Sequence, residues 1–183
     1  MRERKAGVTP LTGHFNGAHT FKVDPKGRVS IPADFRRVLA EGDPDCTDGE
    51  CPRFVLVLGL SDQQMLEGMT VEKSRQIAAA IARMPRKGKE KRLAQLRYQA
   101  NSVTLQVDPN GRLVLPLNCR EKAGITNQAK FVGMGDAFEV WSEERFSADY
   151  DALDAEATSG EEGEALQDSM HDLLDAAMYG DEA

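Results

Sequence analysis

Long apolar runs and cysteines are scarce in this chain of 183 residues. The longest apolar stretch, 54–60, has seven residues, whereas a membrane-spanning helix needs about 20, so we expect no membrane partner. Three cysteines, at 46, 51 and 119, are too few and too scattered for a disulfide framework and favour a reducing cytoplasm. Residues 1–13 are basic but precede no apolar stretch of about 7–15 residues, so we expect no secretory signal peptide.

Basic residues are absent from the last part of the chain. All 23 lysines and arginines lie at or before Arg145, while residues 147–183 contain twelve acidic residues. The net charge of −7 therefore combines a body of +5 with a tail of −12. A basic body with an acidic tail indicates a polyanionic partner, but an ordinary soluble protein with a solvated tail has the same composition. Charge alone leaves both interpretations open.

An internal repeat is the strongest feature of the sequence. Residues 21–36 align without gaps on residues 105–120 at an offset of 84, and seven of the sixteen positions are identical. Each copy is followed by a helix-like stretch, a loop and an apolar run, and the runs at 53–58 and 130–134 align at an offset of 77. Two similar segments in the same order indicate a duplication.

Each copy has the local chemistry of a β-hairpin followed by a short helix. The shared segment Val-Asp-Pro-x-Gly-Arg combines a proline that presets φ with a glycine that supplies positive φ. Val29 and Ile31, like Leu113 and Leu115, give the outgoing strand one buried face. Prolines at 32 and 116 end these strands and begin helices predicted over 32–39 and 116–123.

One repeat is too small to be stable alone, because some 40–50 residues bury too little apolar surface. We therefore expect the two copies to interleave about a pseudo-two-fold axis, so that the chain contains its own dimer. The expected layout is a flexible N-terminus (1–12), a first repeat (13–60), a helical linker (61–100), a second repeat (101–146) and an acidic tail (147–183).

The linker and the tail carry helical patterns of opposite charge. In the linker, a helix-start pattern at Ser61 precedes apolar residues at helical spacing, and residues 71–97 contain nine bases against two acids. That surface is either a solvated helix face or a contact for phosphates. In the tail we expect a flexible tether over 155–165, then an amphipathic helix. We hypothesise that this helix docks while its acids compete with a polyanion; a solubilising tail or a packing helix is the alternative.

The sequence gives little support to catalysis or to a metal site. Asp24 and Asp108 are equivalent carboxylates, but each opens a turn in which aspartate ordinarily bonds its own backbone, which argues against a catalytic dyad. Cys46 and Cys51 lie in an acidic loop without a second pair of zinc ligands. No glycine-rich phosphate loop or nucleophile elbow is present. We therefore expect no enzyme activity, no cofactor and no metal.

The turn arginines are the best candidates for a binding site. Arg28 and Arg112 directly follow the turn glycines, so each should project from the edge of a hairpin. A guanidinium at a rigid turn suits a phosphate or the O6 and N7 atoms of guanine. Each arginine also has an aspartate four residues earlier with which it can pair. The two roles are compatible, and the residues alone do not decide between them.

The doubled Asp-x3-Arg turn, preceded by the segment 15–20, resembles the MraZ family of bacterial transcriptional regulators. The resemblance covers roughly residues 13–146 and includes the closing segment 138–142. It implies an α+β, mainly β fold, in which two tandem AbrB/SpoVT-type swapped-hairpin units form a pseudo-two-fold barrel with linker helices. It also implies a cytoplasmic, nucleoid-associated repressor of the cell-division and cell-wall gene cluster. Such a protein forms ring-shaped homo-oligomers and binds short direct repeats in double-stranded DNA.

The resemblance assigns roles to individual residues. Arg28 stands at the position of the family's DNA-contacting turn arginine, while the two turns are braced by Asp24, Gly27, Asp108 and Gly111. The other expected DNA contacts are basic residues: Lys22, Lys26, Arg36, Arg37, Arg112 and Arg120. The second copy has lost three of these bases, which are replaced by Gln106, Asn110 and Glu121. We therefore expect the second half to bind DNA more weakly than the first.

Two other functions fit the same residues. One is an antitoxin-like AbrB-type DNA-binding module whose tail neutralises a toxin, which a neighbouring toxin gene would favour. The other is a ring-forming assembly protein that does not bind DNA. Salt-dependent binding to DNA distinguishes the assembly protein from the two DNA-binding alternatives.

Overall fold

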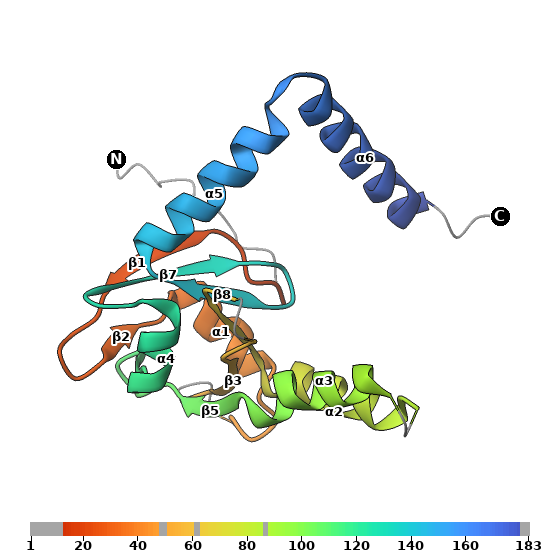
Figure 1. Ribbon diagram of the computed structural model, residues 1–183. Helices are drawn as coiled ribbons and strands as arrows, with labels where there is room; N and C mark the ends of the chain where they lie inside the picture. The colour runs from red at the N-terminus through yellow and green to blue at the C-terminus, as the bar shows by residue number, and fades with distance from the viewer. Residues whose placement is uncertain (1–12, 48–50, 61–62, 86–87, 180–183) are drawn as a thin grey trace, which may run out of the picture. The chain divides into compact units, whose positions relative to one another are not determined.

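The computed structural model consists of two units, one ending at Glu143 and one beginning at Glu144 (Figure 1). It describes residues 13–47, 51–60, 63–85 and 88–179, so the expected flexible N-terminus (1–12) lies outside the described residues. The first repeat forms β1 (Ala18–Lys22), β2 (Arg28–Ser30), α1 (Ala33–Glu41), β3 (Arg53–Val57) and β4 (Leu66–Thr70). The second repeats this order with β5 (Ser102–Gln106), β6 (Arg112–Val114), α4 (Leu117–Ala123), β7 (Gln128–Gly133) and β8 (Phe138–Trp141).

Strands from the two copies interleave. The sheet has the order β1-β7-β8-β4-β3-β5, so the first strand of each copy pairs with the third strand of the other. Strands β2 and β6 pair with each other in a separate two-stranded ribbon. At the centre of the sheet β4 pairs with β8, and Glu67 lies opposite its own counterpart Glu139. The predicted interleaving of the copies about a pseudo-two-fold axis is therefore confirmed.

Strand register corrects the alignment of the third strands. Arg53 pairs with Gln106, while Gln128 pairs with Lys22, which is the counterpart of Gln106. The two strands are therefore equivalent at an offset of 75, and the offset of 77 read from the sequence is wrong. An error of two residues leaves every side chain on the same face of its strand, so the apolar pattern does not reveal it.

The α+β fold class is confirmed, with two departures from the expected architecture. The described strands form no closed barrel, because the edge strands β1 and β5 do not pair with each other. The ribbon instead lies against both edges, with β2 next to β1 and β6 next to β5. The described helices also contain more residues than the described strands, because both the linker and the tail are helical, so the fold is not mainly β.

Both copies contribute to one hydrophobic core. Val29 and Leu113 face each other across the ribbon, and both are buried. The ring of Phe138 lies at the centre of an aromatic cluster, with its centroid 5.0 Å from that of Phe15. Gly68, opposite Phe138 in the register, makes room for this ring, since a Cβ atom there would lie 2.1 Å from it. The core therefore needs side chains from both halves of the chain.

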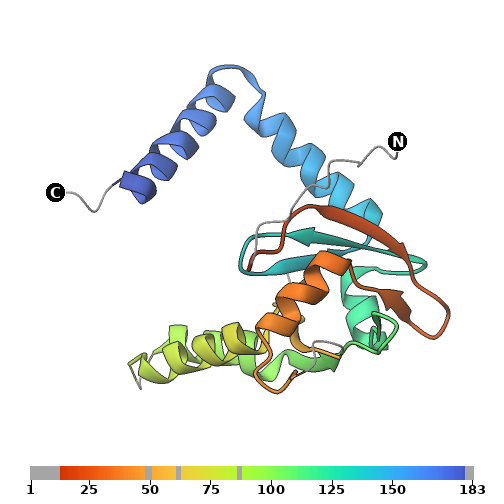
Figure 2. The same cartoon turned by 180° about the vertical axis from the view of Figure 1, so that it is seen from behind.

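The linker contains a strand that the sequence did not reveal. Residues 66–70 form β4, so the helical part is shorter than the expected 61–100; Ser61 itself lies outside the described residues. After β4 come α2 (Val71–Arg83), α3 (Lys89–Gln95) and a π-helical turn, η1 (Leu96–Ala100). Helices α2 and α3 lie side by side (Figure 1 and Figure 2). Ile77 and Tyr98 pack against a small second cluster formed by Val55, Val57 and Met69.

The acidic tail is helical. Helices α5 (Glu143–Ala157) and α6 (Gly160–Tyr179) are separated only by Thr158 and Ser159, so the tether predicted over 155–165 is wrong. Gly163 allows α6 to lie close to the end of α5, since a Cβ atom on Gly163 would lie 2.7 Å from the carbonyl oxygen of Ala157. Helix α5 follows β8 as α2 follows β4, at an offset of 72. The tail thus begins as the second copy's counterpart of the linker.

Candidate nucleic-acid interface

The β2–β6 ribbon presents two arginines on its solvent-facing side. In the antiparallel register Arg28 lies opposite Val114, and Ser30 lies opposite Arg112. Arg28, Arg112 and Val114 are exposed. The middle residue of each strand, Val29 in β2 and Leu113 in β6, points into the core. The sequence analysis does not include Ser30 and Val114 among the candidates. Each lies two residues after an arginine in its strand, however, and side chains two residues apart point to the same face of a strand. The outward face of the ribbon is therefore defined as Arg28, Ser30, Arg112 and Val114.

The first turn is held in shape by its aspartate. One carboxylate oxygen of Asp24 accepts hydrogen bonds from the backbone amides of Lys26 and Arg28, both at 2.9 Å. The amide of Gly27 donates to the carbonyl of Asp24 at 2.8 Å, and Gly27 has a φ of 82°, which favours glycine. These bonds place Asp24 and Gly27 as the residues that fix the turn.

The second turn repeats this geometry. The Asp108 carboxylate accepts hydrogen bonds from the amides of Asn110 and Arg112, again at 2.9 Å. The amide of Gly111 donates to the carbonyl of Asp108 at 2.9 Å, and the φ of Gly111 is 73°. Both arginines therefore leave turns of the same shape.

The two arginine side chains differ. The Arg28 guanidinium lies 2.5 Å from the Asp24 carboxylate, with Nε as the donor. The backbone amide of Arg28, followed by this side chain, holds the pKa of Asp24 below its usual value. Within the described residues, the Arg112 guanidinium forms no hydrogen bond or ion pair. Lys22, Arg28 and Arg112 line one hollow beside the ribbon, where they can face an anionic ligand.

Arg36 and Arg120 lie beneath the turns rather than on the outward face. Each is half-buried, and each reaches the turn of the other copy. A Cβ atom on Gly111 would lie 2.4 Å from Nη1 of Arg36, and one on Gly27 would lie 3.0 Å from Nε of Arg120. Arg120 also donates from Nε to the Leu115 carbonyl at 3.2 Å. The sequence shows that Arg36 and Arg120 are equivalent positions, since they lie 84 residues apart. Only the tertiary structure shows that each of them contacts the turn of the other copy.

The remaining predicted contacts surround the first turn. Lys22 ends β1, Lys26 lies within the turn, and both are exposed. Arg37 is exposed on α1 and lies 3.8 Å from Asp34, a weak surface pair. At the corresponding positions of the second copy, the residues that replace these bases are also exposed: Gln106, Asn110 and Glu121. The first half therefore presents the more basic surface.

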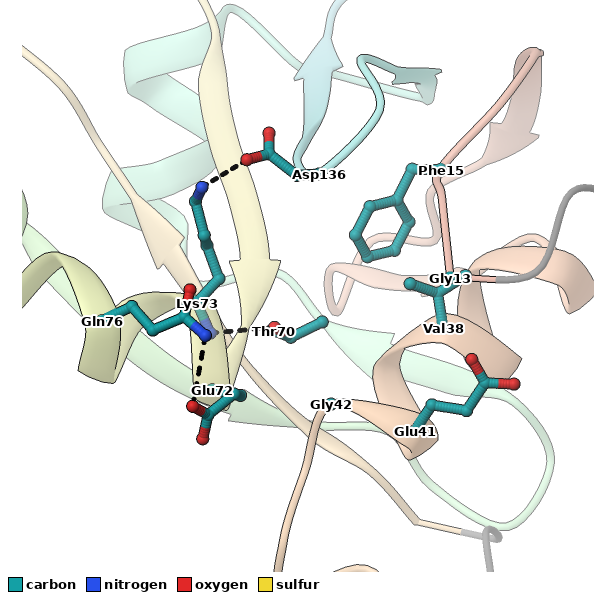
Figure 3. Close-up of a pocket in the computed structure, with 10 residues that line it drawn as sticks. All are labelled: Gly13, Phe15, Val38, Glu41, Gly42, Thr70, Glu72, Lys73, Gln76 and Asp136. Carbon is teal, nitrogen blue, oxygen red and sulfur yellow. Dashed lines mark hydrogen bonds and ion pairs between the residues drawn. The ribbon is translucent and has the colours of Figure 1, made fainter. Parts of the chain in front are cut away.

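A pocket elsewhere in the first unit has polar groups that pair with one another (Figure 3). Lys73 forms an ion pair with Asp136, and its backbone amide donates to the Thr70 hydroxyl at 3.1 Å. Gln76 donates to the Glu72 carboxylate at 3.3 Å. These contacts cap α2 and join it to the β7–β8 turn, so they have a structural explanation. The pocket shows no arrangement of a nucleophile with a base among its described lining residues.

Among the described residues, no three histidine, cysteine, aspartate or glutamate side chains gather where they could hold a metal ion. Within the same residues, no helix combines the length and the apolar composition that crossing a membrane requires.

Comparison with known proteins gives one consistent result. The sequence model of the MraZ protein family, described as antitoxin-like, matches residues 14–97 and 99–169, which include both copies of the repeat. The transcriptional regulator MraZ of Ruegeria sp. (strain TM1040) is 37% identical over 169 residues, covering 92% of this chain and 96% of that protein. That of Ruegeria pomeroyi is 40% identical over 132 residues, covering 72% and 79%.

A third relative, from another organism, gives the same family. The transcriptional regulator MraZ of Herpetosiphon aurantiacus is 38% identical over 143 residues, covering 78% of this chain and 91% of that protein. The match to the family extends to residue 169 and therefore includes α5 and part of α6, which agrees with α5 being a regular element of the second copy. With its doubled turn, its interleaved copies and these relatives, the chain belongs to the MraZ family of transcriptional regulators.

Proposed function

We propose that this regulator binds DNA sequence-specifically by placing the β2–β6 ribbon in the major groove. The observation that carries the proposal is the outward face of the ribbon, where Arg28 and Arg112 stand on the same side. The major groove of B-DNA admits a two-stranded ribbon, and arginine is the side chain that most commonly contacts guanine O6 and N7.

The spacing of the two arginines fits a base-paired ligand. Arg28 and Arg112 are diagonal neighbours in the register, a relation that corresponds to about 7–8 Å between positions. Successive bases along a strand lie about 3.4 Å apart, so the two side chains match positions two base pairs apart. Asp24 fixes the Arg28 guanidinium before binding, which reduces the side-chain entropy lost on contact.

The basic residues around the first turn have a different role in the proposal. Lys22, Lys26 and Arg37 contact phosphates, which position the protein without reading the sequence. Their absence from the second copy makes the contribution of Arg112 smaller than that of Arg28. Arg36 and Arg120 are positioning residues, because they hold the turns of the opposite copy and act on DNA only through them.

The regulatory role rests on family membership. We propose a repressor that binds short direct repeats upstream of the cell-division and cell-wall gene cluster, in the cytoplasm and on the nucleoid, with no enzyme activity. The chain acts as a homo-oligomeric ring. A ring gathers several ribbons, and their linkage raises the affinity for repeated sites through effective concentration.

The test is binding of the full chain to DNA from upstream of its own gene, measured by fluorescence anisotropy at several salt concentrations. Arg28→Ala should weaken this binding by about 1–3 kcal/mol while leaving binding to unrelated DNA nearly unchanged. Arg75→Ala is the matched control, because it removes the same charge from the exposed side of α2. Equal losses from the two variants, or no preference for the upstream DNA, would contradict the proposal.

A further inference from the structure

Helix α6 exposes an apolar face that nothing within its own unit covers. Its side chains, between 40% and 69% exposed, recur on one side of the helix: Leu166, Met170, Leu173, Leu174 and Met178. The spacing of four, three, one and four residues keeps them in one stripe. Four of the five, all except Met178, line a shallow groove. Every charged side chain in α6 is acidic apart from His171, so a partner for this face should be apolar and basic.

A face with the complementary chemistry lies on the linker helix α3 and at the start of η1, which continues it. Leu93 and Leu96 are 51% and 37% exposed, and they line a hollow together with Lys89 and Arg92. These four positions share one side of the helix, because they are separated by three, one and three residues. Glu90 is the acidic residue of α3, and it lies outside the residues that line the hollow.

The two faces lie on helical segments that follow paired strands of the sheet. Strands β4 and β8 are antiparallel partners at the centre of the sheet, with Leu66 opposite Val140. Helix α2 follows the end of β4 and α5 follows the end of β8, so the segments start from opposite ends of this strand pair. Each chain thus carries one basic apolar face and one acidic apolar face. Two different complementary faces on one chain produce head-to-tail association, which closes into a ring when the rotation per subunit allows.

We propose that the apolar face of α6 docks in the Leu93–Leu96 hollow, formed by α3 and the start of η1, of a second copy of this chain. Burial of the leucine and methionine side chains supplies the affinity, as for amphipathic helices in grooves. Lys89 and Arg92 face the acidic helix and select the partner, because exposed charges contribute more to specificity than to affinity. This inference rests on the proposed self-association and names the surface through which it occurs.

The experiment compares variants of the full chain by sedimentation velocity. Leu93→Asp places a carboxylate in the basic hollow, and Leu174→Asp places one in the apolar face of α6. Both side chains are more than half exposed, so neither change removes a buried contact of the fold. Met134→Asp is the matched control, because Met134 is 57% exposed and belongs to neither of the two faces. The wild type and Met134→Asp should sediment as assemblies, while each of the other variants should sediment as a single chain of 20.1 kDa.

Mixing the two variants is the decisive step. Leu93→Asp keeps an intact α6 and Leu174→Asp keeps an intact α3, so one good interface remains between them. An equimolar mixture should therefore form a species of two chains and nothing larger. If both variants assemble like the wild type, the docking inference is wrong while self-association stands. If the wild type is itself a single chain at micromolar concentration, self-association and the docking inference both fail.

Discussion

Substitution of the turn glycines tests how the two copies hold each other. At Gly27, φ is +82°, and an added Cβ atom would lie 2.6 Å from the Leu115 carbonyl oxygen of the other copy. At Gly135, φ is nearly the same, +81°, but no atom lies within 4 Å of the added Cβ. Gly27→Ala and Gly135→Ala therefore share the cost of a left-handed alanine, about 1–2 kcal/mol. Only Gly27→Ala adds a clash with backbone, which typically costs about 1–3 kcal/mol more.

The symmetric position gives an intermediate case. At Gly111 the added Cβ would lie 2.4 Å from Nη1 of Arg36, the mobile end of a long side chain. Gly111→Ala should therefore destabilise more than Gly135→Ala and less than Gly27→Ala, since Arg36 can move and the Leu115 carbonyl cannot. At this chain length each kcal/mol shifts Tm by about 2–4 °C, so thermal unfolding at one fixed protein concentration resolves the order. Equal destabilisation by Gly27→Ala and Gly135→Ala would refute the reasoning.

Two other predictions concern titratable groups. Hydrogen bonds from the Arg53 side chain lower the pKa of Asp43 to about 2, although burial of the carboxyl group opposes this shift. The ionised carboxylate therefore contributes about 2 kcal/mol to the free energy of unfolding at pH values above 3.8, the pKa in the unfolded chain. This contribution is lost as the pH falls towards 2. Asp43→Asn should therefore destabilise the protein at pH 7 and flatten urea unfolding free energies between pH 5 and 2; an unchanged acid profile would contradict this. Burial raises the pKa of the Cys119 thiol to about 11, so this thiol should react with iodoacetamide only in denaturant. Cys46 and Cys51 should react in the folded protein, and mass spectrometry of the labelled chain checks both expectations.

The parts of the fold that the sequence predicts are those set by local chemistry. The Asp-Pro-x-Gly-Arg segments specify their turns through residues within five positions of one another, and both turns have the expected shape. Helix α4 ends at Ala123, the end predicted from the sequence, and Gly124 caps it in the left-handed conformation that glycine favours. The pairing of copies followed from the size of one repeat, which leaves its apolar face uncovered.

The parts of the fold that the sequence does not predict depend on distant contacts. Strand β4 has the sequence Leu-Glu-Gly-Met-Thr, which lacks a strong strand pattern, and its glycine is explained only by the ring of Phe138 across the sheet. The positions of Arg36 and Arg120 beneath the opposite turns depend in the same way on how the copies cross. The glycine and glutamate content of the tail is typical of tethers and predicts one, whereas Gly163 closes a tight corner between two helices.

Interleaving of the copies has a consequence for synthesis on the ribosome. Strand β1 pairs with β7, and Ala18 finds its partner Val132 more than 100 residues later in the chain. At about 5–20 residues per second, the first hairpin emerges roughly 5–20 s before the strand that covers its edge. During that interval the exposed edge of β1 can pair with the same segment of a chain on a neighbouring ribosome. The order of translation therefore exposes this protein to edge-to-edge pairing between nascent chains, and release of the second copy ends this exposure.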